Sequence, residues 1–291
     1  EIKLSQGAKP GHGGILPAAK LTPEIAEMRG VPLGRAVISP PGHSAFSSPV
    51  GLLEFIASLR ELSGGKPVGF KLCVGVKSEF LAICKGMLET DILPDFITVD
   101  GSEGGTGAAP IELINSVGTP MRDGLSFVHS ALRGIGLREP VRLIAAGKVM
   151  SAFHILRTMA LGADMVNAAR AMMFALGCIQ SRHCNANTCP SGVATQDPSR
   201  YRQLDVGDKA RRVAQYHART IHAMLELLSS AGLDDPSQVR PHHILRRVNG
   251  PEIRTYAQLY PGVECDCLLD SGRVPEAWRS DWERADPAKW A

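Results

Sequence analysis

The sequence predicts an α/β protein: the C-terminal portion of a (β/α)8 barrel, about five βα units long, followed by a C-terminal helical appendage. Short apolar runs alternate with longer stretches of helical periodicity, which is typical of βα units and a parallel sheet. The runs end in glycine-rich or polar loops, and a (β/α)8 barrel carries its active site at these carboxyl ends. After residue 205 the pattern changes to polar helical segments.

Each predicted element follows from its local pattern. The expected strands are Ile2–Leu4, Val68–Val74, Phe96–Val99, Val141–Ala145 and Met165–Ala168. The expected helices are Leu52–Leu62, Ser78–Leu88 with Ser78 as N-cap, Gly124–Ile135 and Ala152–Leu161. Five units leave about three of the eight unaccounted for. The chain also opens on Glu1-Ile-Lys-Leu without Met, so we expect it to be the C-terminal part of a longer protein.

Two domains are expected: a partial barrel over residues 1–205 and a helical C-terminal extension and tail over residues 206–291. In the second, Lys209–Ala231 has the pattern of one long amphipathic helix ending at Gly232. Two further helical stretches are expected up to about Tyr260. The charged tail Trp278–Ala291 is expected to be poorly ordered.

Composition excludes several classes of function. The chain has 32 Lys and Arg against 29 Asp and Glu, a net charge of +3, too small to indicate nucleic acid or an anionic membrane as the main partner. Aromatic residues make up 5%, so no stacking platform for single strands is evident. No apolar run reaches the roughly 18 residues of a membrane helix. Seven cysteines, some in a candidate cluster site, fit a reducing compartment, and we expect a cytoplasmic protein.

Three cysteines carry the strongest chemical signal. Cys178, Cys184 and Cys189 are spaced C-x5-C-x4-C in a segment rich in Asn, Ser, Pro and Gly. Three thiolates in one loop suit an iron–sulfur cluster, and three ligands rather than four favour a 3Fe-4S cluster with one thiolate per iron. A zinc site with His183 as fourth ligand, a disulfide, and unrelated buried cysteines are the alternatives. The loop-like surroundings argue against the last of these.

A phosphate site is predicted where the last two strands end. Gly147-Lys148 and Ala168-Ala169-Arg170 follow these strands. Loops at this end of a barrel commonly bind phosphate through backbone N–H groups. The phosphate of flavin mononucleotide (FMN) would fit there, although small residues at strand ends also make ordinary tight turns.

Four stretches carry a resemblance to a known family. They are Lys3-Leu-Ser-Gln-Gly-Ala-Lys-Pro-Gly-His-Gly-Gly, Ile38-Ser-Pro-Pro, Asp100-Gly-Ser-Glu-Gly-Gly-Thr-Gly-Ala, and the cysteine loop continuing as Pro190-Ser-Gly-Val-Ala-Thr-Gln. Over roughly residues 1–268 the chain resembles the glutamate synthase family, specifically the C-terminal part of its FMN-binding synthase domain. It looks most like the shorter, stand-alone FMN-binding members.

The resemblance implies an oxidoreductase acting on CH–NH2 donors, of which this chain is a part. In that family, FMN-dependent reduction converts 2-iminoglutarate, formed from 2-oxoglutarate and ammonia, to glutamate. The electrons pass through a 3Fe-4S cluster from ferredoxin or from an NAD(P)H-oxidising flavoprotein subunit. The ammonia comes from an amidotransferase domain, here expected to be a separate subunit.

The resemblance also implies residue roles. Lys9 and Arg29 match 2-oxoglutarate-binding residues, Gln6 matches a polar residue between flavin and substrate, and Lys71 matches a lysine at the N1–O2 edge of the flavin. The other implied FMN-binding residues are Asp100, Gly104, Gly105, Thr106, Gly107, Gly147, Lys148, Ala169 and Arg170. Cys178, Cys184 and Cys189 match the cluster ligands.

The chain departs from the family at several positions. His12 and Ile15 stand where larger members usually have an acidic residue and a glutamine, and Gly42-His43-Ser44-Ala45 replaces Pro-His-His-Asp. Two other functions therefore remain open. One is a flavoprotein subunit like that of N-methylglutamate synthase. The other is a non-catalytic electron-transfer or scaffold protein.

Overall fold

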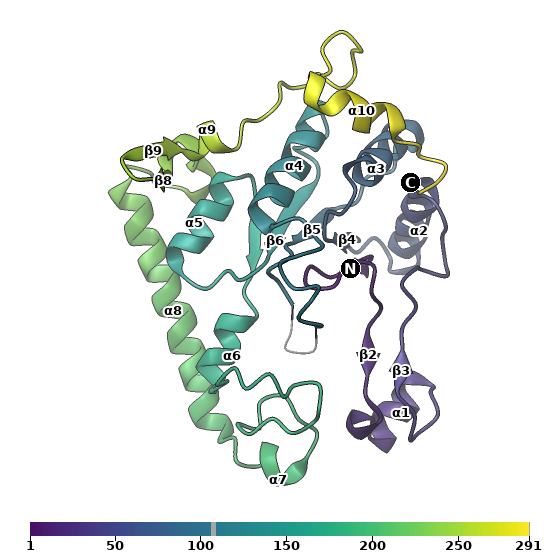
Figure 1. The fold of residues 1–291 in the computed structure, drawn as a ribbon, viewed down its shortest axis with the longest axis vertical. Coiled ribbons are helices and arrows are strands. Elements are labelled where there is room, and N and C mark those ends of the chain that lie inside the picture. The colour runs from purple at the N-terminus through teal and green to yellow at the C-terminus, as the bar shows by residue number, and fades with distance from the viewer. Residues whose placement is uncertain (106–108, 291) are drawn as a thin grey trace.

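The computed structural model describes residues 1–105 and 109–290 and confirms the α/β class. Its central sheet has five parallel strands in the order β1-β4-β5-β6-β7 (Figure 1). This order follows the chain without reversal, as it does around a (β/α)8 barrel, whereas a doubly wound sheet reverses at a switch point. The five predicted strands are confirmed as β1 (Ile2–Lys3), β4 (Phe70–Leu72), β5 (Phe96–Asp100), β6 (Arg142–Ala146) and β7 (Met165–Asn167).

The register gives the two faces of the sheet different roles. Phe70 pairs with Ile97, and Ile97 pairs with Leu143; all three are fully buried against the helices. One residue along, Lys71 pairs with Thr98, so these side chains point to the opposite face. The alternation therefore separates an apolar, helix-covered face from a face that carries polar groups.

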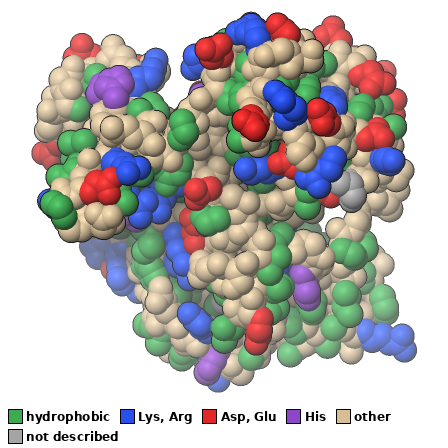
Figure 2. Space-filling model, turned by 45° about the horizontal axis from the view of Figure 1, so that its top comes forward, with side chains coloured by type: hydrophobic (Ala, Val, Ile, Leu, Met, Phe, Trp, Pro, Cys, Tyr) green, Lys and Arg blue, Asp and Glu red, His purple; other side chains and the backbone are tan. Residues whose placement is uncertain are grey.

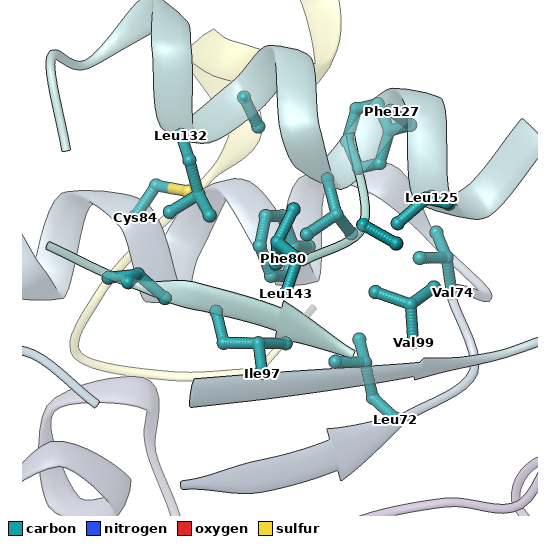
Figure 3. Close-up of a cluster of buried hydrophobic side chains, with 14 of the residues drawn as sticks. Leu72, Val74, Phe80, Cys84, Ile97, Val99, Leu125, Phe127, Leu132 and Leu143 are labelled. Carbon is teal, nitrogen blue, oxygen red and sulfur yellow. The ribbon is translucent and has the colours of Figure 1, made fainter. Parts of the chain in front are cut away.

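Four helices cover the apolar face: α2 (Pro49–Leu62), α3 (Lys77–Thr90), α4 (Met121–Gly134) and α5 (Ala152–Ala160). Figure 3 shows Phe80 and Leu132 of two of these helices above Ile97 and Leu143 of the sheet. The predicted N-cap of α3 is wrong. The helix starts one residue before Ser78, the N-cap residue is Val76 without a side-chain cap, and Ser78 is buried in the first turn.

Between β1 and α2 the chain leaves the sheet and forms an arm, residues 13–39, that extends away from it (Figure 1). The arm contains β2 (Ile15–Leu16), η1 (Ala18–Lys20), α1 (Pro23–Arg29) and β3 (Val37–Ile38). Strands β2 and β3 pair antiparallel. The Thr22 side chain caps α1 by accepting a hydrogen bond from the Ile25 N–H. None of these elements was predicted from the sequence.

The long helix predicted after residue 205 is confirmed as α8 (Val206–Ser230), which packs on α5 and on α6 (Arg170–Leu176). Gly232 follows it with φ +72°. The helical stretches expected up to Tyr260 are wrong in part. A β-hairpin, β8 (Leu245–Asn249) and β9 (Glu252–Thr255), precedes α9 (Tyr256–Leu259), and Asn249-Gly250 lies at its turn. The remaining short helices are α7 (Pro198–Tyr201), η2 (Pro236–Gln238) and η3 (Pro241–His243).

The tail, expected to be poorly ordered, instead packs on the core through α10 (Glu276–Arg284). Trp278 stacks on Phe127 with ring centroids 4.9 Å apart. The Lys85 ammonium lies over the Trp282 ring and donates to Ala285 O at 2.9 Å. Aromatic and cation–π contacts of this kind each contribute on the order of 1 kcal/mol, enough to dock a short polar helix.

Basic and acidic side chains are interspersed on the face shown in Figure 2. Within residues 1–105 and 109–290, no helix combines the length and the hydropathy needed to cross a membrane.

A hydrogen-bonded cluster around Arg138 joins α4 to the start of β6 and the turn before β7. Its guanidinium donates to Val141 O at 2.9 Å, Gly162 O at 2.8 Å and Asp164 Oδ2 at 2.9 Å. Its Nε donates to His129 Nδ1 at 3.0 Å, which requires a neutral imidazole at that nitrogen. Burial, together with Arg138 and Arg133, lowers the pKa of His129 to about 4.

We expect this histidine to make stability pH-dependent. Its folded-state pKa of about 4 lies below its ordinary 6.5, so between these values the unfolded chain binds a proton that the folded chain does not. The free energy of unfolding should fall as the pH drops through this range, by up to about 3 kcal/mol. Urea unfolding from pH 7 to pH 4 measures this slope, which His129→Gln should flatten and exposed His222→Gln should leave as it is. An equal slope in all three proteins would contradict the assignment.

Candidate functional site

The loop after β1 and the loop after β5 pack closely against each other at the carboxyl ends of these strands. The Gly7 N–H donates to Asp100 Oδ2 at 3.0 Å. A Cβ at Gly7 would overlap the Gly101 carbonyl, and a Cβ at Gly105, which has φ +113°, would overlap the Ala8 side chain. Only glycine permits this approach, so these glycines serve close packing rather than flexibility.

A buried ion pair lies beside this contact. The Lys71 ammonium is 3.1 Å from Asp100 Oδ2, and the two side chains are 21% and 4% exposed. Lys71 and Asp100 belong to adjacent strands and share the polar face of the sheet. The same carboxylate oxygen therefore contacts Lys71 in β4 and Gly7 in the loop that follows β1.

Lys9 and Gln6 lie in the loop after β1. Lys9 is only 8% exposed, and in the described residues its ammonium makes one hydrogen bond, to Gly13 O at 3.2 Å. Two of its three N–H donors are thus available to a ligand. The Gln6 Oε1 accepts from the Lys3 ammonium at 3.0 Å, and its Nε2 lies close to Gly105.

Several charged side chains act on one another at this place. Burial lowers the pKa of Lys3, and the neighbouring ammonium groups of Lys71 and Lys9 lower it further, while Asp100 and Glu1 act in the opposite direction. Lys3, Lys9 and Lys71 lie here together with the carboxylates of Glu1, Asp100 and Glu103. Among the described residues Lys9 has no carboxylate at ion-pair distance, so its ammonium suits an anionic group of a ligand.

The predicted phosphate residues lie at the ends of β6 and β7. Arg170 Nη2 donates to Gly105 O at 2.6 Å, which joins the start of α6 to the loop after β5. Gly147, with φ +142°, packs against Met121 and the Gly101 backbone. Lys148 and Ala169 are exposed. The predicted residues Thr106 and Gly107 lie outside the described part of the chain.

Arg29 is not brought to this group of residues. It is the last residue of α1 in the arm and is exposed. Within residues 1–105 and 109–290 it makes no hydrogen bond or ion pair with Lys9 or Gln6.

The three predicted cluster ligands lie in a turn-rich loop, residues 177–197, which we call the cysteine loop. Gln180, Arg182 and Asn187 have positive φ there. All seven cysteines are free. Among the described residues, no three His, Cys, Asp or Glu side chains lie close enough together to hold one metal ion.

Cys189 lies in surroundings that stabilise its thiolate. It is 4% exposed. Burial opposes its thiolate, but the Ser191 hydroxyl and backbone N–H groups of Ala194, Ser191 and Val193 outweigh burial and lower its pKa. Thiolates that bind metals are stabilised in this way.

Sequence reasoning missed two residues that join the arm to the cysteine loop. The Lys20 ammonium donates to Cys184 O at 2.9 Å, and Asn187 Nδ2 donates to Ala19 O at 2.9 Å. A lysine after Pro-Ala-Ala and an asparagine in a polar loop give no local signal of such a role. It also missed Glu103, whose carboxylate accepts from the Met121 N–H and so caps α4.

Removing the Asp100 charge should destabilise the fold. Asp100→Asn leaves the Lys71 ammonium partly buried and without its counter-charge, which we expect to cost about 3 kcal/mol of unfolding free energy. The double variant Asp100→Asn with Lys71→Met should recover most of this loss, and the exposed Asp234→Asn should change little. Urea unfolding measures all three, and full stability in Asp100→Asn alone would refute the role given to the pair.

Comparison with known proteins identifies the family of this chain. The model of a conserved region in glutamate synthase matches residues 1–234. A glutamate synthase large subunit-like protein, YerD of Bacillus subtilis, is 42% identical over 247 residues, covering 85% of this chain and 47% of its own length. The archaeal glutamate synthase [NADPH] of Methanocaldococcus jannaschii is 38% identical over 241 residues, covering 82% of this chain and 46% of its own.

The chain thus spans about half the length of the curated relatives it matches. Among solved structures, a double mutant of flavocytochrome b2 with sulfite bound matches 75% of this chain and 42% of its own, with 11% identity and a TM-score of 0.42. That similarity is too low to support an argument. The sequence matches are sufficient by themselves: the chain belongs to the glutamate synthase family.

Proposed function

We propose that this chain is part of a glutamate synthase-type oxidoreductase. The reaction is the FMN-dependent reduction of 2-iminoglutarate, formed from 2-oxoglutarate and ammonia, to glutamate. One observation carries the proposal: in a chain of this family, a cationic group of Lys3, Lys9 and Lys71 gathers at the carboxyl ends of the parallel strands.

The substrate is a dianion, and the residues of the loop after β1 suit it. Lys9 is buried next to the glycine-rich turn and has N–H donors left for a carboxylate. Gln6 offers an amide beside Gly105 for orienting the acceptor. Arg29 is proposed as the second carboxylate partner, and a guanidinium can bind a carboxylate through two parallel hydrogen bonds.

The flavin site is proposed around Lys71. When bound, FMN would supply the hydride. Lys71, held by Asp100, would place a positive charge at the edge of the isoalloxazine ring. Gly104, Gly105, Thr106 and Gly107 would let the backbone approach the cofactor, and the close packing of Gly105 on Ala8 fits such an approach. Gly147, Lys148, Ala169 and Arg170 are the proposed phosphate residues.

The electron path is proposed to run through a 3Fe-4S cluster held by Cys178, Cys184 and Cys189. In such a cluster each thiolate binds a different iron, so the thiols need not converge on one ion as a zinc site requires. The stabilised Cys189 thiolate fits this donor set. Ferredoxin or an NAD(P)H-oxidising flavoprotein subunit is the proposed electron donor, and a separate amidotransferase subunit is a possible source of ammonia.

The role of Lys9 is testable by removing its charge. A hydrogen bond to a charged group contributes about 1.5–3 kcal/mol, so Lys9→Met should raise the KM for 2-oxoglutarate roughly 10- to 100-fold. Steady-state assays of the full-length protein measure this, with the exposed Lys66→Met as the matched control. An unchanged KM in Lys9→Met would refute the role given to Lys9, whereas a full-length protein without any reductive activity would favour the non-catalytic scaffold alternative.

The cluster is testable by iron and sulfide analysis and by electron paramagnetic resonance of the oxidised, anaerobically purified full-length protein. A three-iron signal is expected, and Cys184→Ser should abolish it while the exposed Cys265→Ser keeps it. Zinc, or no metal, in the wild-type protein would remove the proposed electron path.

The nitrogen donor separates the two catalytic alternatives. Glutamate formed from 2-oxoglutarate, ammonia and reductant supports the proposal. Product formed only with methylamine would instead assign the chain to an N-methylglutamate synthase-like enzyme.

A further inference from the structure

Two segments far apart in the sequence are joined at a single place. The Lys20 ammonium, in the arm, donates to Cys184 O at 2.9 Å and to Ala194 O at 3.4 Å, both in the cysteine loop. Beside it, Asn187 Nδ2 donates to Ala19 O at 2.9 Å. We call these contacts of Lys20 and Asn187 the latch.

The loop side of the latch is itself fixed. Asn187 has φ +62°. Its backbone carbonyl accepts from the Thr195 hydroxyl at 2.7 Å, and its Oδ1 accepts from the Gln196 N–H at 2.7 Å. These hydrogen bonds join two parts of the cysteine loop to each other, and the Asn187 Nδ2 remains to donate to the arm. The loop that contacts the arm is thus also held by hydrogen bonds of its own.

Lys20 brings a positive charge to the backbone of the cysteine loop. Its two acceptors are the carbonyl oxygens of Cys184, which is one proposed ligand, and of Ala194, in the same loop. Within the described residues no carboxylate lies at ion-pair distance from Lys20. In that part of the chain its hydrogen-bond partners are the two carbonyl oxygens.

Lys20 lies between two proposed substrate residues in the sequence. Lys9 precedes it by eleven residues and Arg29 follows it by nine. Of these two, Arg29 belongs to the arm, as Lys20 does.

We propose that Lys20 is a positioning residue that fixes the cysteine loop on the arm and supplies the positive charge that favours the reduced form of a cluster held there. The redox part rests on the proposed function, because it needs the cluster; the positioning part does not. Reduction adds one negative charge to a cluster, and a nearby cation stabilises that charge and raises the reduction potential.

Hydrogen exchange tests positioning without any cofactor. In the full-length protein freed of iron, Lys20→Met should speed exchange about tenfold at Leu21 in the arm and at Gly192 and Gln196 in the loop, because the latch restrains both segments. Lys20→Arg should stay near the wild-type rate, and the exposed Lys289→Met serves as control. Unchanged exchange in Lys20→Met would overturn the positioning role.

Redox titration of the three-iron signal tests the charge. Lys20→Met should shift the reduction equilibrium about tenfold towards the oxidised form, or about 59 mV for a one-electron couple, and Lys20→Arg should not. An unchanged potential in Lys20→Met would overturn the redox role. Loss of the cluster from Lys20→Met, with retention in Lys20→Arg, would support the positioning role. Absence of iron from the wild-type protein would refute the proposed electron path and with it the redox role of Lys20. Hydrogen exchange would still test the positioning role of Lys20.

Discussion

The carboxylate of Asp100 holds the candidate site together. It is buried at the end of β5, and one of its oxygens accepts from both the Lys71 ammonium and the Gly7 N–H. Through Lys71 it fixes the charge at the end of β4, and through Gly7 it fixes the loop that carries Gln6 and Lys9. A buried charge is costly in free energy unless it is paired and hydrogen-bonded, so both contacts help to hold Asp100 at this position.

The two ends of the sheet are held together by different contacts. At the amino ends of β6 and β7, Arg138 donates to the carbonyls of Val141 and Gly162, neither of which is a proposed site residue. At the carboxyl ends, close glycine contacts and the Lys71–Asp100 ion pair join the strand ends to their loops. In a barrel, the carboxyl ends are where an active site is expected.

The sequence was informative where a feature depends on local pattern. The five strands and α8 follow from apolar periodicity, whereas the ion pair between Lys71 and Asp100 was not predicted. Features that depend on distant partners could not be predicted. The order of the tail depends on Trp278 meeting Phe127, about 150 residues away, and the role of Lys20 depends on a carbonyl 164 residues away. The exposed position of Arg29, likewise, is set by the path of the arm.

The charge of Lys9 acts before any contact is made. Among the described residues, no carboxylate lies at ion-pair distance from its ammonium. In 0.1 M salt a charge is felt over about 10 Å, so the field of Lys9 extends beyond the residues that it touches. Under the proposed function, an anionic substrate would be attracted by this charge before it binds, and the attraction would weaken as the ionic strength rises.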